Sequence, residues 1–180
     1  SDGTYVVEAS DAAGNVSKKT VTIDKTAPEF TGLKSGVYYQ DDITVDVRDT
    51  NLDKITAKVY ADNYEVVELE NNAKLTKESV YYLTATDKAG NTTSIYVAVD
   101  KTNPKFIGLM NGHQYNKDLV INVEDLKVKT IEVFDYKDGT TKTVENGTVI
   151  TEEGKYKITA TDYSGRKTQI YVILDKTAPE

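Results

Sequence analysis

The 180-residue chain contains no cysteine and no tryptophan, a single histidine and only three prolines. Without cysteine, a disulfide framework, a thiol nucleophile and a Cys-ligated zinc site are excluded. No run approaches the roughly 18 consecutive apolar residues of a membrane span, and no basic segment precedes an apolar stretch at the first residue. We therefore expect no membrane insertion and no secretion signal within this piece, and we take it to be part of a longer parent.

Positive charge is also scarce, because 22 Lys and Arg stand against 29 Asp and Glu and leave a net charge of −7. The cations are scattered along the chain. Nucleic-acid binding depends on clustered cations that neutralise phosphates, and a negative overall field opposes it. Nucleic acid is therefore not an expected partner.

One short string recurs through the chain. Asp-Lys-Thr-Ala-Pro at residues 24–28 returns as Asp-Lys-Thr-Asn-Pro at 100–104 and as Asp-Lys-Thr-Ala-Pro at 175–179, so the period is 76 and then 75 residues. All three prolines stand at this one phase, and each fixes its own φ and restricts the residue before it. Pro28 and Pro104 therefore mark module junctions.

A second marker keeps the same register. It is Tyr-x-x-x-Ala-x-Asp followed three residues later by Gly, and it occurs at Tyr5 to Gly14, Tyr81 to Gly90 and Tyr156 to Gly165. We therefore expect residues 1–23 to be the last hairpin of a preceding repeat, 24–99 and 100–174 to be complete repeats, and 175–180 to open another. A lone hairpin is marginal in water, so residues 1–23 should be frayed, packed on a neighbour or completed by another chain.

Within each complete repeat, apolar residues alternate with polar ones. Ile43, Val45 and Val47 show this two-residue period, and Asp62-Asn63 and Asp138-Gly139 provide tight turns at equivalent places. Nowhere do apolar residues recur at the intervals of three and four residues that are typical of a helix. Each repeat offers about seven short strands with turns every 8–12 residues, which is typical of an immunoglobulin-like (Ig-like) sandwich. The prediction is an all-β chain of tandem Ig-like β-sandwich modules arranged as beads on a string.

Residues 2–17 (DGTYVVEASDAAGNVS) and 21–28 (VTIDKTAP) resemble the tandem bacterial Ig-like repeats of Gram-positive cell-surface or secreted proteins. The resemblance runs over essentially the whole chain, and it implies an extracellular or cell-surface location. Such repeats serve as stalks or spacers, as parts of adhesins, or as accessory modules of secreted enzymes. We therefore expect a non-catalytic spacer that contacts neighbouring modules of its own chain. The alternative is an adhesin or carbohydrate-binding accessory module with a host or glycan ligand.

Catalytic candidates are weak. His113 has no counterpart in the preceding repeat, where Val37 stands at its position. The adjacent pairs Asp41-Asp42 and Glu152-Glu153 lie in strand or turn segments, where neighbouring side chains tend to point in opposite directions. Paired glycosidase carboxylates must instead face one cleft. The chain is therefore not expected to be an enzyme.

The repeated tyrosines and glycines have expected structural roles. Tyr5, Tyr81 and Tyr156 stand where an Ig-like sandwich places its tyrosine corner, with the ring at the edge of the core and the hydroxyl bonded to an upstream main-chain group. Contact with a ligand is the alternative. The glycines of the same marker, Gly14, Gly90 and Gly165, close a turn that begins at the aspartate.

The same aspartates suggest a second use. In this fold the start of the first strand, the B–C loop and the F–G loop share one end of the sandwich. That end would gather Asp24, Asp49 and Asp87 in one repeat, and Asp100, Asp125 and Asp162 in the next. No cofactor is expected from the residues alone, but the resemblance makes junction calcium an open alternative. Asn91 is replaced by Arg166 in the second repeat, which would place a cation beside that site.

Overall fold

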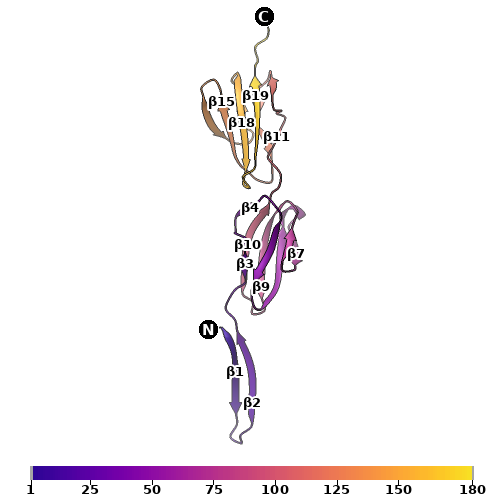
Figure 1. The fold of residues 1–180 in the computed structure, drawn as a ribbon, viewed down its shortest axis with the longest axis vertical. Helices are drawn as coiled ribbons and strands as arrows, with labels where there is room; N and C mark the ends of the chain where they lie inside the picture. The colour runs from indigo at the N-terminus through magenta and orange to yellow at the C-terminus, as the bar shows by residue number, and fades with distance from the viewer. Residues whose placement is uncertain (1, 180) are drawn as a thin grey trace. The chain divides into compact units, whose positions relative to one another are not determined.

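The computed structural model describes residues 2–179, and these residues form strands and one short 3-10 helix, η1 (Tyr60–Asp62) (Figure 1). The predicted all-β class is confirmed. Across the described residues, no helix is long and apolar enough to cross a membrane. Contacts divide the chain into two compact units, one of residues 1–36, 43–76 and 80–97, the other of 37–42, 77–79 and 98–180.

The chain opens with a regular antiparallel hairpin of β1 (Gly3–Ser10) and β2 (Val16–Ile23). Its register runs from Gly3 opposite Ile23 to Ser10 opposite Val16 without interruption. Every residue of both strands is exposed. The hairpin is therefore fully paired, although it carries no buried side chain.

The first sandwich is built from eight strands in two sheets. These are β3 (Glu29–Thr31), β4 (Val37–Tyr39), β5 (Ile43–Arg48), β6 (Leu52–Val59), β7 (Glu65–Leu69), β8 (Ala73–Leu75), β9 (Ser79–Asp87) and β10 (Thr92–Val99). One sheet has the order β4-β10-β9-β6-β7 and the other the order β3-β5-β8. This places strands G, F, C and C′ of an Ig-like domain in one sheet and A, B and E in the other.

The second sandwich repeats this order. Its strands are β11 (Lys105–Ile107), β12 (His113–Tyr115), β13 (Leu119–Val120), β14 (Asn122–Glu124), β15 (Val128–Asp135), β16 (Thr140–Val144), β17 (Val149–Ile150), β18 (Gly154–Asp162) and β19 (Lys167–Leu174). The larger sheet runs β12-β19-β18-β15-β16, while β11 pairs with β14 and β13 with β17. Strand B is divided at Ile121, so one strand of the repeat carries two labels. Both sandwiches therefore have the Ig-like order that the strand pattern predicted.

The sequence pattern missed one strand in each sandwich. β4 and β12 are three residues long, too short to show alternation, and β12 pairs with β19 in parallel. The single histidine, His113, lies exposed on β12 and packs edge-on against Tyr115, with ring centroids 4.7 Å apart. These extra strands raise the number in a repeat above the seven expected.

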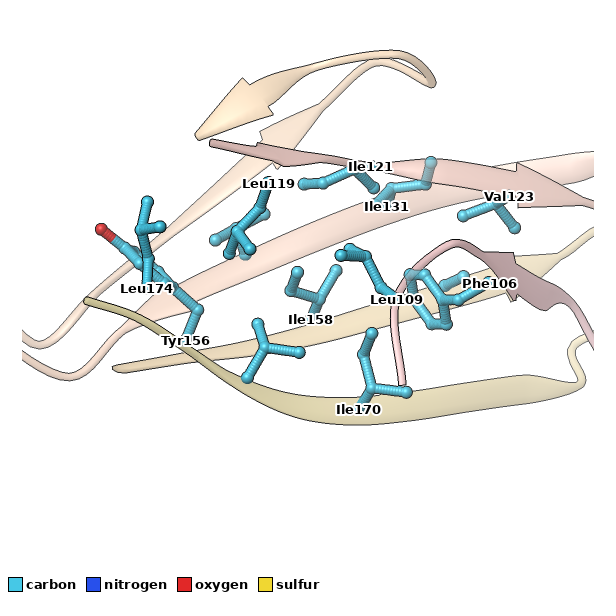
Figure 2. Close-up of a cluster of buried hydrophobic side chains, with 13 residues drawn as sticks. Phe106, Leu109, Leu119, Ile121, Val123, Ile131, Tyr156, Ile158, Ile170 and Leu174 are labelled. Atoms are coloured by element: carbon cyan, nitrogen blue, oxygen red, sulfur yellow. The ribbon is translucent and has the colours of Figure 1, made fainter. Parts of the chain in front are cut away.

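The core of the second sandwich is a single cluster between its strands (Figure 2). All of its members come from residues 106–174, and Figure 2 labels Leu119, Ile121, Ile131, Ile158 and Ile170 among them. Ile121 and Ile158 are completely buried. The core of the first sandwich is formed in the same way by the inward residues of β5, β6, β9 and β10, such as Val45 and Leu83.

On the outer face of the larger sheet a lysine stands opposite an aromatic residue, and the two exchange strands between the repeats. Lys58 on β6 stands opposite Tyr82 on β9. In the second sandwich Phe134 on β15 stands opposite Lys157 on β18, whose ammonium lies 5.1 Å from the ring centroid. Each repeat therefore keeps one cation and one aromatic ring at this cross-strand position.

Ile158→Ala tests the core. Removing a fully buried side chain of this size costs about 2–5 kcal/mol because it leaves a cavity. We expect calorimetry of the whole chain to show a lower melting temperature for one sandwich. Met110→Ala, at a side chain that is 60% exposed, is the control. Equal melting temperatures for the two variants would contradict the assigned core.

Candidate functional site

Six aspartates occupy equivalent places at the ends of strands. Asp24 directly follows β2, and Asp100 directly follows β10. Each aspartate therefore lies between the last strand of one repeat and the first strand of the next. Asp49 follows β5, and Asp125 follows β14. The remaining two, Asp87 and Asp162, are the last residues of β9 and β18.

The structure brings these residues together as two groups of three. In the first cluster (Asp24, Asp49 and Asp87) and in the second cluster (Asp100, Asp125 and Asp162), one carboxylate oxygen of each residue lies within 4.8 Å of those of the other two. Each cluster lies within a single compact unit. The convergence expected from the Ig-like strand order is therefore present in both repeats. Ion binding itself remains a prediction.

Hydrogen bonds satisfy the carboxylates of the first cluster. The amide nitrogen Nδ2 of Asn51 donates to Asp24 Oδ2 at 2.8 Å, and Nδ2 of Asn91 donates to Asp87 Oδ2 at 2.7 Å. The main-chain amide of Asn51 donates to Asp49 Oδ1 at 2.7 Å. Two asparagines thus donate hydrogen bonds to all three acids.

The second cluster lacks the two side-chain amide donors, although the main-chain amide of Lys127 still donates to Asp125 Oδ1 at 3.0 Å. Asn51 and Asn91 are replaced by Lys127 and Arg166 at the equivalent positions. Lys127 is exposed, and the Nη2 of Arg166 donates to a main-chain carbonyl, that of Gln40, at 2.9 Å. Four buried carboxylate oxygens remain without a hydrogen-bond partner: Asp100 Oδ1, Asp100 Oδ2, Asp125 Oδ2 and Asp162 Oδ2.

The pKa values reflect this difference. Burial raises the pKa of Asp100 to about 7, with further increases from the charges of Asp125, Asp162 and Glu78 that outweigh the opposing effect of Arg166. Burial also raises the pKa of Asp125. For Asp87 burial acts in the same direction, but hydrogen bonds from Asn91, Ala89 and Gly90 hold its pKa below the ordinary value.

The turn that follows β1, β9 and β18 is the same in all three copies of the repeated marker. The main-chain amide of the residue four positions on donates to the aspartate Oδ1, at 2.9 Å for Asp11, 2.8 Å for Asp87 and 2.9 Å for Asp162. Gly14, Gly90 and Gly165 stand in this turn at φ of 86°, 92° and 93°. That left-handed backbone conformation is one that residues with a Cβ adopt only under strain.

The tyrosines of the repeated marker differ in burial. Tyr81 and Tyr156 are 3% and 4% exposed, and the Tyr156 hydroxyl donates to the carbonyl of Glu152 at 2.7 Å. This upstream bond is the geometry of a tyrosine corner. Tyr5, on the hairpin, is 42% exposed.

Sequence reasoning missed an acidic residue that binds each junction. In all three copies the main-chain amide of the junction lysine donates to a carboxylate 23 residues earlier in the chain. The bonds run from Lys25 to Asp2 at 3.1 Å, from Lys101 to Glu78 at 2.5 Å and from Lys176 to Glu153 at 2.6 Å. We call this contact the junction anchor. The fixed spacing was the available signal.

Further contacts strengthen the junctions. The ammonium of Lys101 lies 2.7 Å from Asp42, and that of Lys176 lies 2.5 Å from Asp118 at the equivalent place. The main-chain amide of Asp100 donates to the carbonyl of Tyr39 at 2.9 Å. Pro28 and Pro104, which lie three residues after Lys25 and Lys101, are buried.

Comparison with known proteins finds no matching family and finds solved structures of low similarity. No protein-family model matches the chain, and no curated protein matches it. Among solved structures, similarity is found to a tetra-tandem repeat in the extending region of a large adhesion protein (18% identity, 98% of this chain and 57% of that one, TM-score 0.35). It is also found to DIP-gamma IG1+IG2 (16% identity, 83% and 97%, TM-score 0.36). At these values the similarities carry no argument about function.

A third similar structure is a Bacteroides ovatus glucan-utilisation protein, SGBP-B, in complex with a mixed-linkage heptasaccharide (16% identity, 97% of this chain and 53% of that one, TM-score 0.27). The class of protein rests instead on the strand order of the chain itself, which is that of tandem Ig-like domains.

The buried charge of Asp100 gives a pH prediction. Its folded pKa of about 7 lies above the ordinary carboxyl value. Between these values the folded chain holds a proton that the unfolded chain has released, so stability falls as pH rises from about 4 to about 7. Asp100→Asn removes the charge and adds a donor. In chelator at pH 7.5 it should melt several degrees above the wild type, and the difference should vanish near pH 4. A constant difference across this range would contradict the prediction.

Tyr156→Phe tests the tyrosine corner. The substitution keeps the ring and removes the bond to Glu152, so it should cost about 1 kcal/mol of unfolding free energy. Urea denaturation measures this loss. Tyr136→Phe, at a tyrosine that is 52% exposed, is the matched control and should be near neutral. A neutral Tyr156→Phe would show that the hydroxyl bond contributes nothing.

Proposed function

We propose that this chain is a non-catalytic spacer of a bacterial surface or secreted protein, in which tandem Ig-like modules carry a functional domain away from the cell. The observation that supports this proposal best is the junction anchor, because the same contact recurs at all three junctions. A spacer must limit the motion of each junction, whereas a string of independent binding modules has no such requirement.

The anchor acts on the main chain, where it is most effective. A carboxylate that accepts a main-chain N–H makes a charge-assisted hydrogen bond and restricts the backbone of that residue directly. At the first and third junctions the threonine that follows also donates its hydroxyl to the same acid, Thr26 to Asp2 and Thr177 to Glu153. The junction is further stiffened by proline and has no Gly/Ser-rich tract.

Glu78→Ala tests the spacer function. The chain has no cysteine, so spin labels can be placed at Val66→Cys and Val149→Cys, two exposed positions in different sandwiches. We expect Glu78→Ala to broaden the distance distribution between the labels in pulsed electron paramagnetic resonance, because it frees the main chain at Lys101. Glu153→Ala removes the anchor that lies after the second sandwich, so it should leave the distribution unchanged. An unchanged width in Glu78→Ala would count against the spacer proposal.

A second function, glycan binding, is favoured by one exposed group of tyrosines. Tyr60 lies 4.9 Å from Tyr64 and 5.8 Å from Tyr96 between ring centroids, and both contacts are edge-on. Tyr60 and Tyr64 are 40% and 54% exposed. Tyr64 has a left-handed φ of 65°, which is rare for an aromatic residue and is typical of functional loops. Exposed rings with hydroxyl groups can stack against sugars and bond to them.

Glycan arrays distinguish the two functions. If the tyrosine group binds sugar, the wild-type chain should be retained by a defined set of glycans and the double substitution Tyr60→Ala, Tyr64→Ala should lose that retention. Tyr136→Ala, at the position equivalent to Tyr60, is the control in the second sandwich. Absence of retention across host and plant glycans would leave the spacer as the function of this chain.

A further inference from the structure

The second aspartate cluster contains uncompensated acceptors in a buried place. Asp100 and Asp162 have no exposed surface, and Asp125 is partly buried. Four of their six carboxylate oxygens have neither solvent contact nor a hydrogen-bond donor. Burying a carboxylate without a partner is strongly unfavourable, and proteins resolve such sites by pairing the charge or by coordinating a metal ion.

The geometry suits an ion. Oxygens that share one Ca²⁺ lie about 2.3–2.6 Å from it, so any two of them can be separated by at most about 5 Å. One carboxylate oxygen from each of Asp100, Asp125 and Asp162 lies within 4.8 Å of the other two, so the three meet this limit. We propose that the second cluster is a calcium site, in which Asp100, Asp125 and Asp162 supply the protein oxygens and the first cluster has no comparable site.

The donor set defines the kind of ion. All three side chains offer carboxylate oxygen, which hard divalent cations prefer, and the chain has no cysteine to bind a softer metal. Arg166 supplies one positive charge nearby. Three carboxylates and one guanidinium leave a formal charge of about −2, which one divalent cation would balance. The guanidinium does not satisfy these acids, because four of their buried oxygens and its own Nε have no hydrogen-bond partner.

The first cluster provides the contrast on which the assignment rests. Its three acids have the same positions in the fold and meet the same 4.8 Å limit. Asn51 and Asn91 nevertheless donate to Asp24 and Asp87, and no buried oxygen of that cluster is without a partner among the described residues. The two sites differ in whether the protein has already supplied side-chain donors, and in the burial of the first acid, which is complete for Asp100 and partial for Asp24.

Isothermal titration of the whole chain with CaCl₂, after treatment with chelator, tests the proposal. The wild type should bind one ion per chain. Asp100→Asn should abolish the saturable heat, and Asp24→Asn, the equivalent substitution in the first cluster, should leave one ion bound. No binding by the wild type, or loss of binding in Asp24→Asn but not in Asp100→Asn, would overturn the proposal.

Calorimetric unfolding gives a second readout that detects a misfolded variant. Ca²⁺ should raise the melting temperature of the wild type and of Asp24→Asn by several degrees relative to chelator, because it binds only the folded state. Asp100→Asn should retain its cooperative transition and show no Ca²⁺ shift. A wild-type transition that Ca²⁺ leaves unchanged would refute the site. The spacer proposal would still stand, because it depends on the anchor at Glu78.

Discussion

The two-residue period of strand F organises each sandwich. In β18 the inward positions are Tyr156, Ile158, Ala160 and Asp162, and all of them are buried. A single alternation therefore places the tyrosine corner at one end, the core in the middle and a carboxylate at the other end. Because successive strand residues face opposite sides of a sheet, a shift of one position would expose all four groups together. β9 repeats the arrangement from Tyr81 to Asp87.

An inward carboxylate at the end of a strand must be compensated, and the two repeats differ in how far this is done. In the first, asparagine side chains donate to the acids and the pKa of Asp87 stays low. In the second, arginine replaces the second asparagine, its guanidinium bonds elsewhere, and the pKa values of Asp100 and Asp125 rise through burial. Equivalent positions in one fold thus have different electrostatic states because of two neighbouring substitutions and because Asp100 is fully buried where Asp24 is only partly buried.

The sequence was sufficient for features that depend on local pattern. Alternation and turn residues predicted the strands of both repeats, and the Ig-like strand order predicted that the aspartates would converge. It was insufficient where the signal is long-range. The three-residue strands β4 and β12 have no local pattern, and the anchor from Glu78 to Lys101 joins residues 23 positions apart. The direction in which Arg166 bonds depends on geometry that residue identity does not specify.

The inverted pair on the outer sheet face affects how neighbouring repeats can misassemble. Adjacent modules of one fold can exchange strands during folding, and such exchange is a characteristic failure of repeat proteins. If β6 of one repeat paired with β18 of the next in native register, Lys58 would face Lys157. Two like charges directly opposite each other destabilise a sheet. The opposite placement of the cation in the two repeats therefore disfavours the pairing of β6 with β18 and leaves the native pair of each module intact.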